Sequence, residues 1–84
     1  MFDIIYSKQA VKFLKKLETA LVLQILEKID KLKDTPVMHD SKILEGYNER
    51  LFRVCVGDYR ILYEIDHKDN IIGIVKINKR SRVY

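Results

Sequence analysis

The sequence predicts an α+β domain of the order β-α-α-β-β-β, in which a two-helix hairpin packs on one face of a small, mostly antiparallel four-stranded sheet. Two consecutive stretches carry apolar residues at helical spacing, and three later β-favouring stretches are separated by turn signals. At 84 residues, with 48% hydrophobic residues, one Pro and three Gly, the chain is expected to form one domain over residues 1–84.

The first half of the chain predicts a strand followed by two helices. Phe2–Tyr6 is a β-favouring run, and Ser7 is a candidate N-cap for a helix over Lys8–Leu17, which carries an amphipathic apolar stripe. Thr19 is a second candidate N-cap, and Ala20–Lys33 has the strongest helical pattern of the sequence. Because only a residue or two separates the helices, they should form an αα-hairpin.

The second half predicts three strands. Pro36 ends the second helix, and residues 35–50 are expected to form a connecting loop. "GD" at 57–58 is a two-residue hairpin turn, and "DHKDN" at 66–70 is a longer polar turn. The strands are expected at Leu51–Val56, Tyr59–Ile65 and Ile71–Ile77. The pattern leaves open where the first strand joins the sheet.

The hairpin turn decides which side chains share a face, because pairing Val56 with Tyr59 also pairs Cys55 with Arg60. One face is then apolar and aromatic, and the helices must cover it. That face comprises Phe52, Val54, Val56, Tyr59, Ile61 and Tyr63. The other face comprises Leu51, Arg53, Cys55, Arg60, Leu62 and Glu64. Arg53 and Arg60 become diagonal neighbours, roughly 7–8 Å apart between Cα atoms.

Two guanidinium groups at this spacing repel each other unless an anion lies between them. A phosphate suits them, because each guanidinium fork can hold two phosphate oxygens. In a purely structural interpretation, both arginines pair with acids or lie along an exposed face, and Glu64 on the same face could serve one of them. The C-terminal segment favours anion binding instead, since residues 75–84, "VKINKRSRVY", are basic, contain no acid and end in a tyrosine. We therefore expect a positive pocket with an aromatic rim, where phosphates meet cations and bases stack on the ring.

The composition excludes several other classes of protein. Cys55 is the only cysteine, which excludes a disulfide scaffold and a cysteine-built metal site. The net charge of +4 is mildly basic and compatible with nucleic acid. No secretion signal or membrane span is found, so a cytoplasmic protein is expected. Without metal-ligand spacing or a phosphate-cradling glycine loop, neither a metal nor a cofactor is expected.

Two motifs resemble those of a known family. "LFRVCVGDYRILY" at 51–63 is similar to the strand–turn–strand unit of the RelE/ParE toxin superfamily, and "INKRSRVY" at 77–84 is similar to the C-terminal motif of its RelE branch. The similarity covers essentially the whole chain. It implies a RelE-like fold and a toxin of a type II toxin–antitoxin module. That branch consists of ribosome-dependent endoribonucleases that cleave mRNA without a metal, by 2′-OH attack, and so inhibit translation.

The resemblance also implies a set of catalytic residues. Arg60 matches the strand arginine that holds the scissile phosphate, and Arg53 matches a basic position on the preceding strand. Arg80 and Tyr84 match the basic residue and the tyrosine of the C-terminal motif. Lys79 stands where relatives often have histidine or lysine. We expect these five residues to be catalytic, with Tyr84 or Lys79 as the general base.

One position departs from the family pattern. Leu51 stands where well-studied relatives have a lysine, so that role is vacant or is filled by Arg50 or Lys79. Arg50, Lys76 and Arg82 are expected to bind RNA.

The partners that the resemblance implies are a RelB-like antitoxin and the ribosome with mRNA in its A site. We expect the antitoxin to have acidic and amphipathic segments, to dock on the exposed side of the helical hairpin and to cover the basic face. DNA contact is expected only through the antitoxin, and no membrane contact is expected. Two alternatives stay open: a ParE-like inhibitor of DNA gyrase that cleaves nothing, and a non-catalytic module that only binds the antitoxin.

Overall fold

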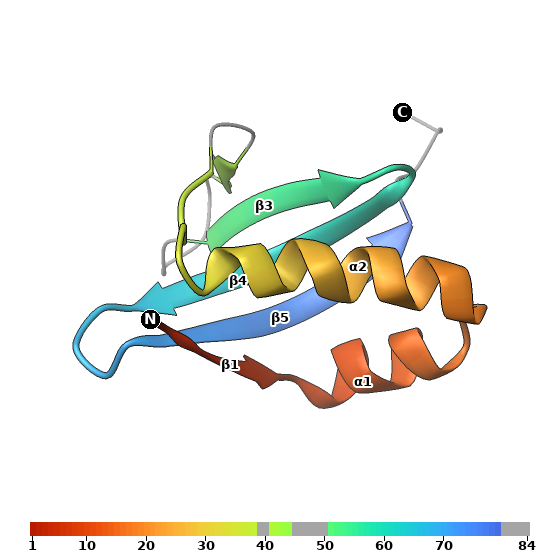
Figure 1. Cartoon of the computed structure of the whole chain (residues 1–84), viewed down its shortest axis with the longest axis horizontal. Helices are drawn as coiled ribbons and strands as arrows, with labels where there is room; N and C mark the ends of the chain where they lie inside the picture. The colour runs from red at the N-terminus through yellow and green to blue at the C-terminus, as the bar shows by residue number, and fades with distance from the viewer. Residues whose placement is uncertain (39–40, 45–50, 80–84) are drawn as a thin grey trace.

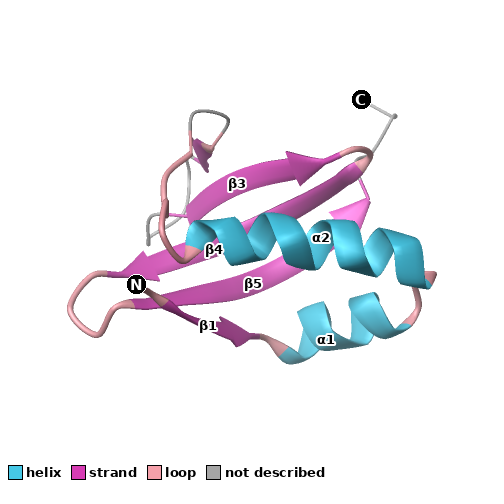
Figure 2. Cartoon of the chain, in the orientation of Figure 1, coloured by secondary structure: helices cyan, strands magenta, loops and turns pink. Residues whose placement is uncertain are grey.

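Two helices lie against one face of a five-stranded sheet (Figure 1; element types are coloured in Figure 2). The computed structural model describes residues 1–38, 41–44 and 51–79. The elements are β1 (Asp3–Tyr6), α1 (Lys8–Lys15), α2 (Thr19–Leu32), β2 (Lys42–Leu44), β3 (Leu51–Val56), β4 (Tyr59–Asp66) and β5 (Ile71–Lys79). The α+β class and the helical hairpin on a sheet are confirmed.

The sheet has one strand more than the sequence predicts. Its order is β1-β5-β4-β3-β2, and β3, β4 and β5 are antiparallel neighbours. The additional strand is β2, which lies within the predicted loop and pairs antiparallel with the start of β3. β1 is parallel to β5, from Asp3 opposite Ile71 to Tyr6 opposite Ile74. This pairing gives the first strand the position that the sequence pattern left open.

The starts of the two helices differ. Ser7 caps α1 as predicted, since its Oγ accepts a hydrogen bond from the backbone N–H of Ala10 at 3.1 Å. The predicted cap at Thr19 is wrong, because Glu18 is the N-cap of α2 and its side chain makes no capping bond. Packing therefore stabilises α2, through the buried Ile25, Ile29 and Leu32. No helix in the described part of the chain is long and apolar enough to cross a membrane.

The β3–β4 hairpin has the predicted register. The predicted pairs Val56–Tyr59 and Cys55–Arg60 are observed, and the pairing continues in the same register to Phe52–Tyr63. Gly57 has a φ of +57°, and in a two-residue turn with positive φ at the first position glycine avoids the strain that other residues would carry. Tyr63 is fully buried, and its hydroxyl donates to the Pro36 carbonyl at 2.7 Å.

A β-bulge interrupts the pairing of β4 with β5. Leu62 lies opposite Lys76, whereas the next residue of β4, Tyr63, lies opposite Ile74, so Val75 has no partner. Ile74 and Ile77 are both buried in the core, although strict alternation would place them on opposite faces.

The far edge of β5 is completed by side chains of the first helical segment. β1 ends at Tyr6, and beyond it Ser7 Oγ donates to the Val75 carbonyl at 2.7 Å. Gln9 Nε2 donates to the Ile77 carbonyl at 2.9 Å, and the Ile77 N–H donates to Gln9 Oε1 at 3.0 Å. The Gln9 amide therefore satisfies the backbone groups that a neighbouring strand would otherwise pair with.

Candidate functional site

The sheet face opposite the helices carries four basic side chains from four strands. One row of paired residues crosses four strands of this face. From β2 to β5 it consists of Lys42, Arg53, Leu62 and Lys76. Arg60 is on the same face, because it is two residues before Leu62 on β4. We call Lys42, Arg53, Arg60 and Lys76 the cationic face.

On the cationic face, Arg60 belongs to β4, the strand between those of Arg53 and Lys76. Arg53 on β3 and Lys76 on β5 are both its diagonal neighbours, at the roughly 7–8 Å Cα spacing of such pairs. Lys42 and Lys76 are exposed, whereas Arg53 and Arg60 are half-buried. Since charges near the protein interact more strongly than charges in bulk water, an anion above Arg60 would be attracted by all its cationic neighbours.

No residue of the cationic face forms an ion pair with a carboxylate within residues 1–38, 41–44 and 51–79. Glu64 was the acid that the structural interpretation offered as a partner. Its Oε1 lies 3.3 Å from the position that a Cβ on Gly73 would occupy, so the carboxylate leans over β5. Within the described residues, no ion pair joins Glu64 to Arg53 or Arg60.

The two lysines of β5 emerge on opposite faces. Lys79 lies opposite Tyr59, whose ring packs edge-on against Phe13 of α1 at 6.0 Å between ring centroids. Because paired residues share a face, Lys79 emerges on the helix side, whereas Lys76 belongs to the cationic face. The other predicted site residues, Arg50, Arg80, Arg82 and Tyr84, lie outside the described residues.

Sequence reasoning missed two contributors to the site. Lys42 falls in a segment predicted as a loop, where the β-favouring Ile43 next to it was the available signal. Gln9 holds the end of β5 that carries the predicted site residues, yet its partner Ile77 is 68 residues away, and nothing local in the sequence indicates the contact.

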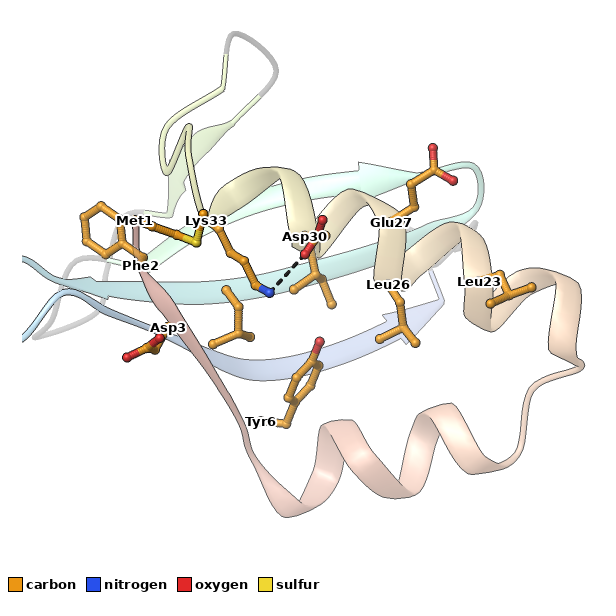
Figure 3. Close-up of a pocket in the computed structure, with 11 residues that line it drawn as sticks. Met1, Phe2, Asp3, Tyr6, Leu23, Leu26, Glu27, Asp30 and Lys33 are labelled. Atoms are coloured by element: carbon orange, nitrogen blue, oxygen red, sulfur yellow. Dashed lines mark ion pairs between the residues drawn. The ribbon is translucent and has the colours of Figure 1, made fainter.

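A groove on the helix side is the second surface feature of interest. It lies between β1 and α2, has a volume of about 850 Å³, and includes Tyr6 and Leu26 in its lining (Figure 3). At its rim Lys33 Nζ lies 3.1 Å from Asp30 Oδ1, and this hydrogen bond raises the pKa of the Lys33 ammonium group. Burial raises the pKa of the Tyr6 hydroxyl above its ordinary value, although the charge of Lys33 opposes that shift.

A second groove continues the first along the helical hairpin. It lies between α1 and α2, has a volume of about 500 Å³, and shares Tyr6 and Leu26 with the first groove. Its other apolar lining residues include Val11 and Leu14. Leu23, in the lining of the first groove, is 61% exposed. We call the two together the hairpin groove.

Comparison with known proteins gives the family. The model described as "ParE toxin of type II toxin-antitoxin system, parDE" matches residues 4–84. A curated relative from Methanocaldococcus jannaschii, named "Putative toxin RelE1", is 34% identical over 86 residues that cover 99% of this chain and 94% of the relative. The chain belongs to the RelE/ParE toxin superfamily. The toxin's entire cationic face lies within the residues that the family model matches.

Solved structures of RelE toxins have the same fold. The toxin superimposes on RelE of the archaeal RelE–RelB complex from Pyrococcus horikoshii OT3 with a TM-score of 0.85, at 36% identity over 98% of each chain. Isolated Escherichia coli RelE gives a TM-score of 0.83 at 18% identity, over 99% of the toxin and 88% of that chain, which shows the fold alone. The RelE-like fold expected from the sequence motifs is confirmed.

Proposed function

We propose that this toxin inhibits translation as a ribosome-dependent endoribonuclease that cleaves mRNA without a metal ion. The observation that carries the proposal is the cationic face, where Arg53 and Arg60 are half-buried and pair with no described carboxylate. Permanently charged guanidinium groups suit a phosphodiester whose negative charge grows in the transition state. The similarity to RelE toxins supports this type of activity.

The proposed reaction needs a base, an acid and stabilisation of the phosphate. The 2′-oxygen bonds to the 3′-phosphorus while the bond to the 5′-oxygen breaks, which leaves a 2′,3′-cyclic phosphate and a 5′-hydroxyl. Arg53 and Arg60, with Arg80 as a third cation, stabilise the crowded phosphate. Tyr84 takes the 2′-proton in preference to Lys79, which emerges on the helix side. A lysine or arginine of the site protonates the 5′-oxygen.

We propose that the ribosome supplies the orientation of the substrate. The cationic face is an open sheet surface, and the exposed Lys42 and Lys76 suit contacts to backbone phosphates, to which Arg50 and Arg82 would add. Messenger held in the A site would present one phosphodiester to Arg60. Such positioning can be worth about 7–11 kcal/mol of the barrier. The toxin would act in the cytoplasm, where mRNA is translated.

Mapping of mRNA 5′ ends in a translating extract tests this function. We expect codon-phased cuts with the wild-type toxin and a loss of about 10²–10³-fold with Arg60→Ala, because Arg60 stabilises the transition-state charge. Lys68→Ala is the matched control, since Lys68 is an exposed cation in the β4–β5 turn. Cuts that persist unchanged in Arg60→Ala, Arg80→Ala and a Tyr84 deletion would refute the proposed site.

Inhibition of DNA gyrase is the alternative function, and the match to the ParE family model favours testing it. A supercoiling assay with purified gyrase separates the two. We expect supercoiling to proceed at its normal rate with the toxin present. Inhibition of supercoiling by both wild-type toxin and Arg60→Ala, together with uncut mRNA, would favour gyrase inhibition. Loss of both activities would favour a module that only binds its antitoxin.

We propose that a RelB-like antitoxin neutralises the toxin, and that any contact with DNA is made by the antitoxin and not by the toxin itself. Solved complexes of RelE with RelB from Pyrococcus horikoshii and Escherichia coli support such a partner. An amphipathic segment of the antitoxin would lay its apolar side in the hairpin groove, and an acidic segment would cover the cationic face.

Binding of the cognate antitoxin to charged groove variants tests the first contact. Leu23→Glu places a charge in the groove and should weaken binding at least tenfold, because an apolar contact would be lost and a charge desolvated. Val37→Glu is the control, since Val37 is 53% exposed and lines neither part of the groove. Equal affinities of the two variants, measured by calorimetry, would show that the antitoxin docks elsewhere.

A further inference from the structure

Two buried polar atoms on the open side of the sheet lack a hydrogen-bond partner. They are Nε of Arg60 and Oδ1 of Asn78, and within the described residues no other buried side-chain nitrogen or oxygen is left unpaired. The first is a hydrogen-bond donor and the second is an acceptor. Since buried polar groups are nearly always satisfied, this complementary pair needs a physical explanation.

The register places the two residues directly opposite each other. Arg60 of β4 pairs with Asn78 of β5, and paired residues project their side chains to the same face. The backbone N–H and C=O of Ile77 both bond to Gln9, so those of Asn78 point toward β4. Arg60 and Asn78 are therefore a hydrogen-bonded pair with Cα atoms about 5.5 Å apart. Side-chain rotation alone can join Nε to Oδ1 at this separation.

The orientation of the Asn78 amide fits this partner. Rotation of the amide by half a turn would direct Nδ2, a donor, toward the region that now holds Oδ1. A donor in that place could not accept the hydrogen of the Arg60 Nε, whereas Oδ1 can. With Oδ1 shielded from water, the Arg60 side chain, on the residue paired with Asn78, can supply the donor that Oδ1 lacks.

We propose that Asn78 is the positioning residue of Arg60. When a phosphate binds the guanidinium group, Nε–H of Arg60 donates to Oδ1 of Asn78, and the two terminal Nη groups stay directed at the phosphate oxygens. Asn78 itself does not touch the phosphate. The consequence for mRNA cleavage rests on the proposed function, whereas the hydrogen bond and its effect on phosphate binding do not.

NMR of the ¹⁵N-labelled toxin with inorganic phosphate tests the hydrogen bond. The Nε–H signal of Arg60 is identified by its loss in Arg60→Lys. With phosphate we expect slow exchange of this proton with water in the wild type and in Asn78→Asp, which keeps the acceptor, and fast exchange in Asn78→Ala. Cys55→Ala is the matched control, because Cys55 flanks Arg60 on the other neighbouring strand. The same exchange rate in Asn78→Ala and wild type would overturn the inference.

Phosphate affinity tests whether Asn78 acts through Arg60. Asn78→Ala should weaken phosphate binding about tenfold, the usual effect of losing one charge-assisted hydrogen bond. In an Arg60→Lys background the same substitution should change nothing, because lysine has no Nε–H group. An equal loss in both backgrounds would show that Asn78 acts independently of Arg60 and would overturn the inference.

Cleavage in the translating extract connects the inference with the proposed function. We expect Asn78→Ala to reduce codon-phased cleavage about tenfold and Cys55→Ala to leave it unchanged. If no form of the toxin cleaves mRNA, the proposed function fails while the two phosphate experiments still decide the role of Asn78. If mRNA is cleaved and the Arg60 Nε–H signal is insensitive to Asn78, the inference alone fails.

Discussion

Gln9→Met tests how much the first helix contributes to holding β5. The substitution keeps the length of the side chain but removes both hydrogen bonds to the backbone of Ile77, which are 2.9 and 3.0 Å long. Each such bond contributes about 0.5–1.5 kcal/mol, so the free energy of unfolding should fall by about 1–3 kcal/mol. Among the described strands none can replace the lost bonds, because β1 ends at Tyr6.

Urea denaturation measures this free energy, and Gln24→Met is the matched control. Gln24 is an exposed glutamine in α2, so its replacement should change stability by less than about 0.5 kcal/mol. Hydrogen exchange at the Ile77 amide should also accelerate in Gln9→Met, because that N–H loses its acceptor. Equal stabilities of the two variants, with unchanged exchange at Ile77, would refute the reasoning.

Three further substitutions probe other parts of the fold. Gly57→Ala should cost about 1–2 kcal/mol in urea denaturation, because alanine must adopt a φ of +57°, although its methyl group meets nothing within 4 Å; an unchanged midpoint would contradict this. Tyr63→Phe removes the hydrogen bonds of the hydroxyl to Pro36 and Ser41 and should lower the free energy of unfolding by about 1–3 kcal/mol. An unaltered Tm in calorimetry would contradict this prediction. Because burial raises the folded-state pKa of Tyr6 above 10.0, its contribution to stability is complete below that pH and is lost as pH rises through the folded-state pKa. Tyr6→Phe should therefore lose less stability than wild type as the pH rises above 10.0, and equal losses would exclude Tyr6 as the cause.

The hairpin register could be predicted because local chemistry determines it. A two-residue turn leaves one way to pair β3 with β4, and alternation then assigns Arg53 and Arg60 to the face opposite the helices. β2 could not be predicted in the same way. It has three residues, and its pairing with β3 depends on contacts distant in the sequence rather than on local propensity. Lys42 was therefore missed along with its strand.

The faces of β5 could not be predicted because of the bulge. Strict alternation from Ile72 and Ile74 would direct Lys76 toward the helices and leave Lys79 on the open side of the sheet. The unpaired Val75 reverses both assignments. No residue in this stretch indicates a bulge by its chemistry. Which of Lys76 and Lys79 lies on the cationic face therefore required the three-dimensional register.

The position of β5 between β1 and β4 has a consequence for synthesis of the protein. β1 meets the sheet only through β5, and Gln9 of α1 also bonds to it, yet β5 is translated after every other strand of the sheet. β1 and α1 therefore emerge from the exit tunnel before β5, the strand to which both bond, has been made. Their native contacts join residues far apart in the sequence and form only later. A nascent copy cannot complete its fold until β5 has left the tunnel.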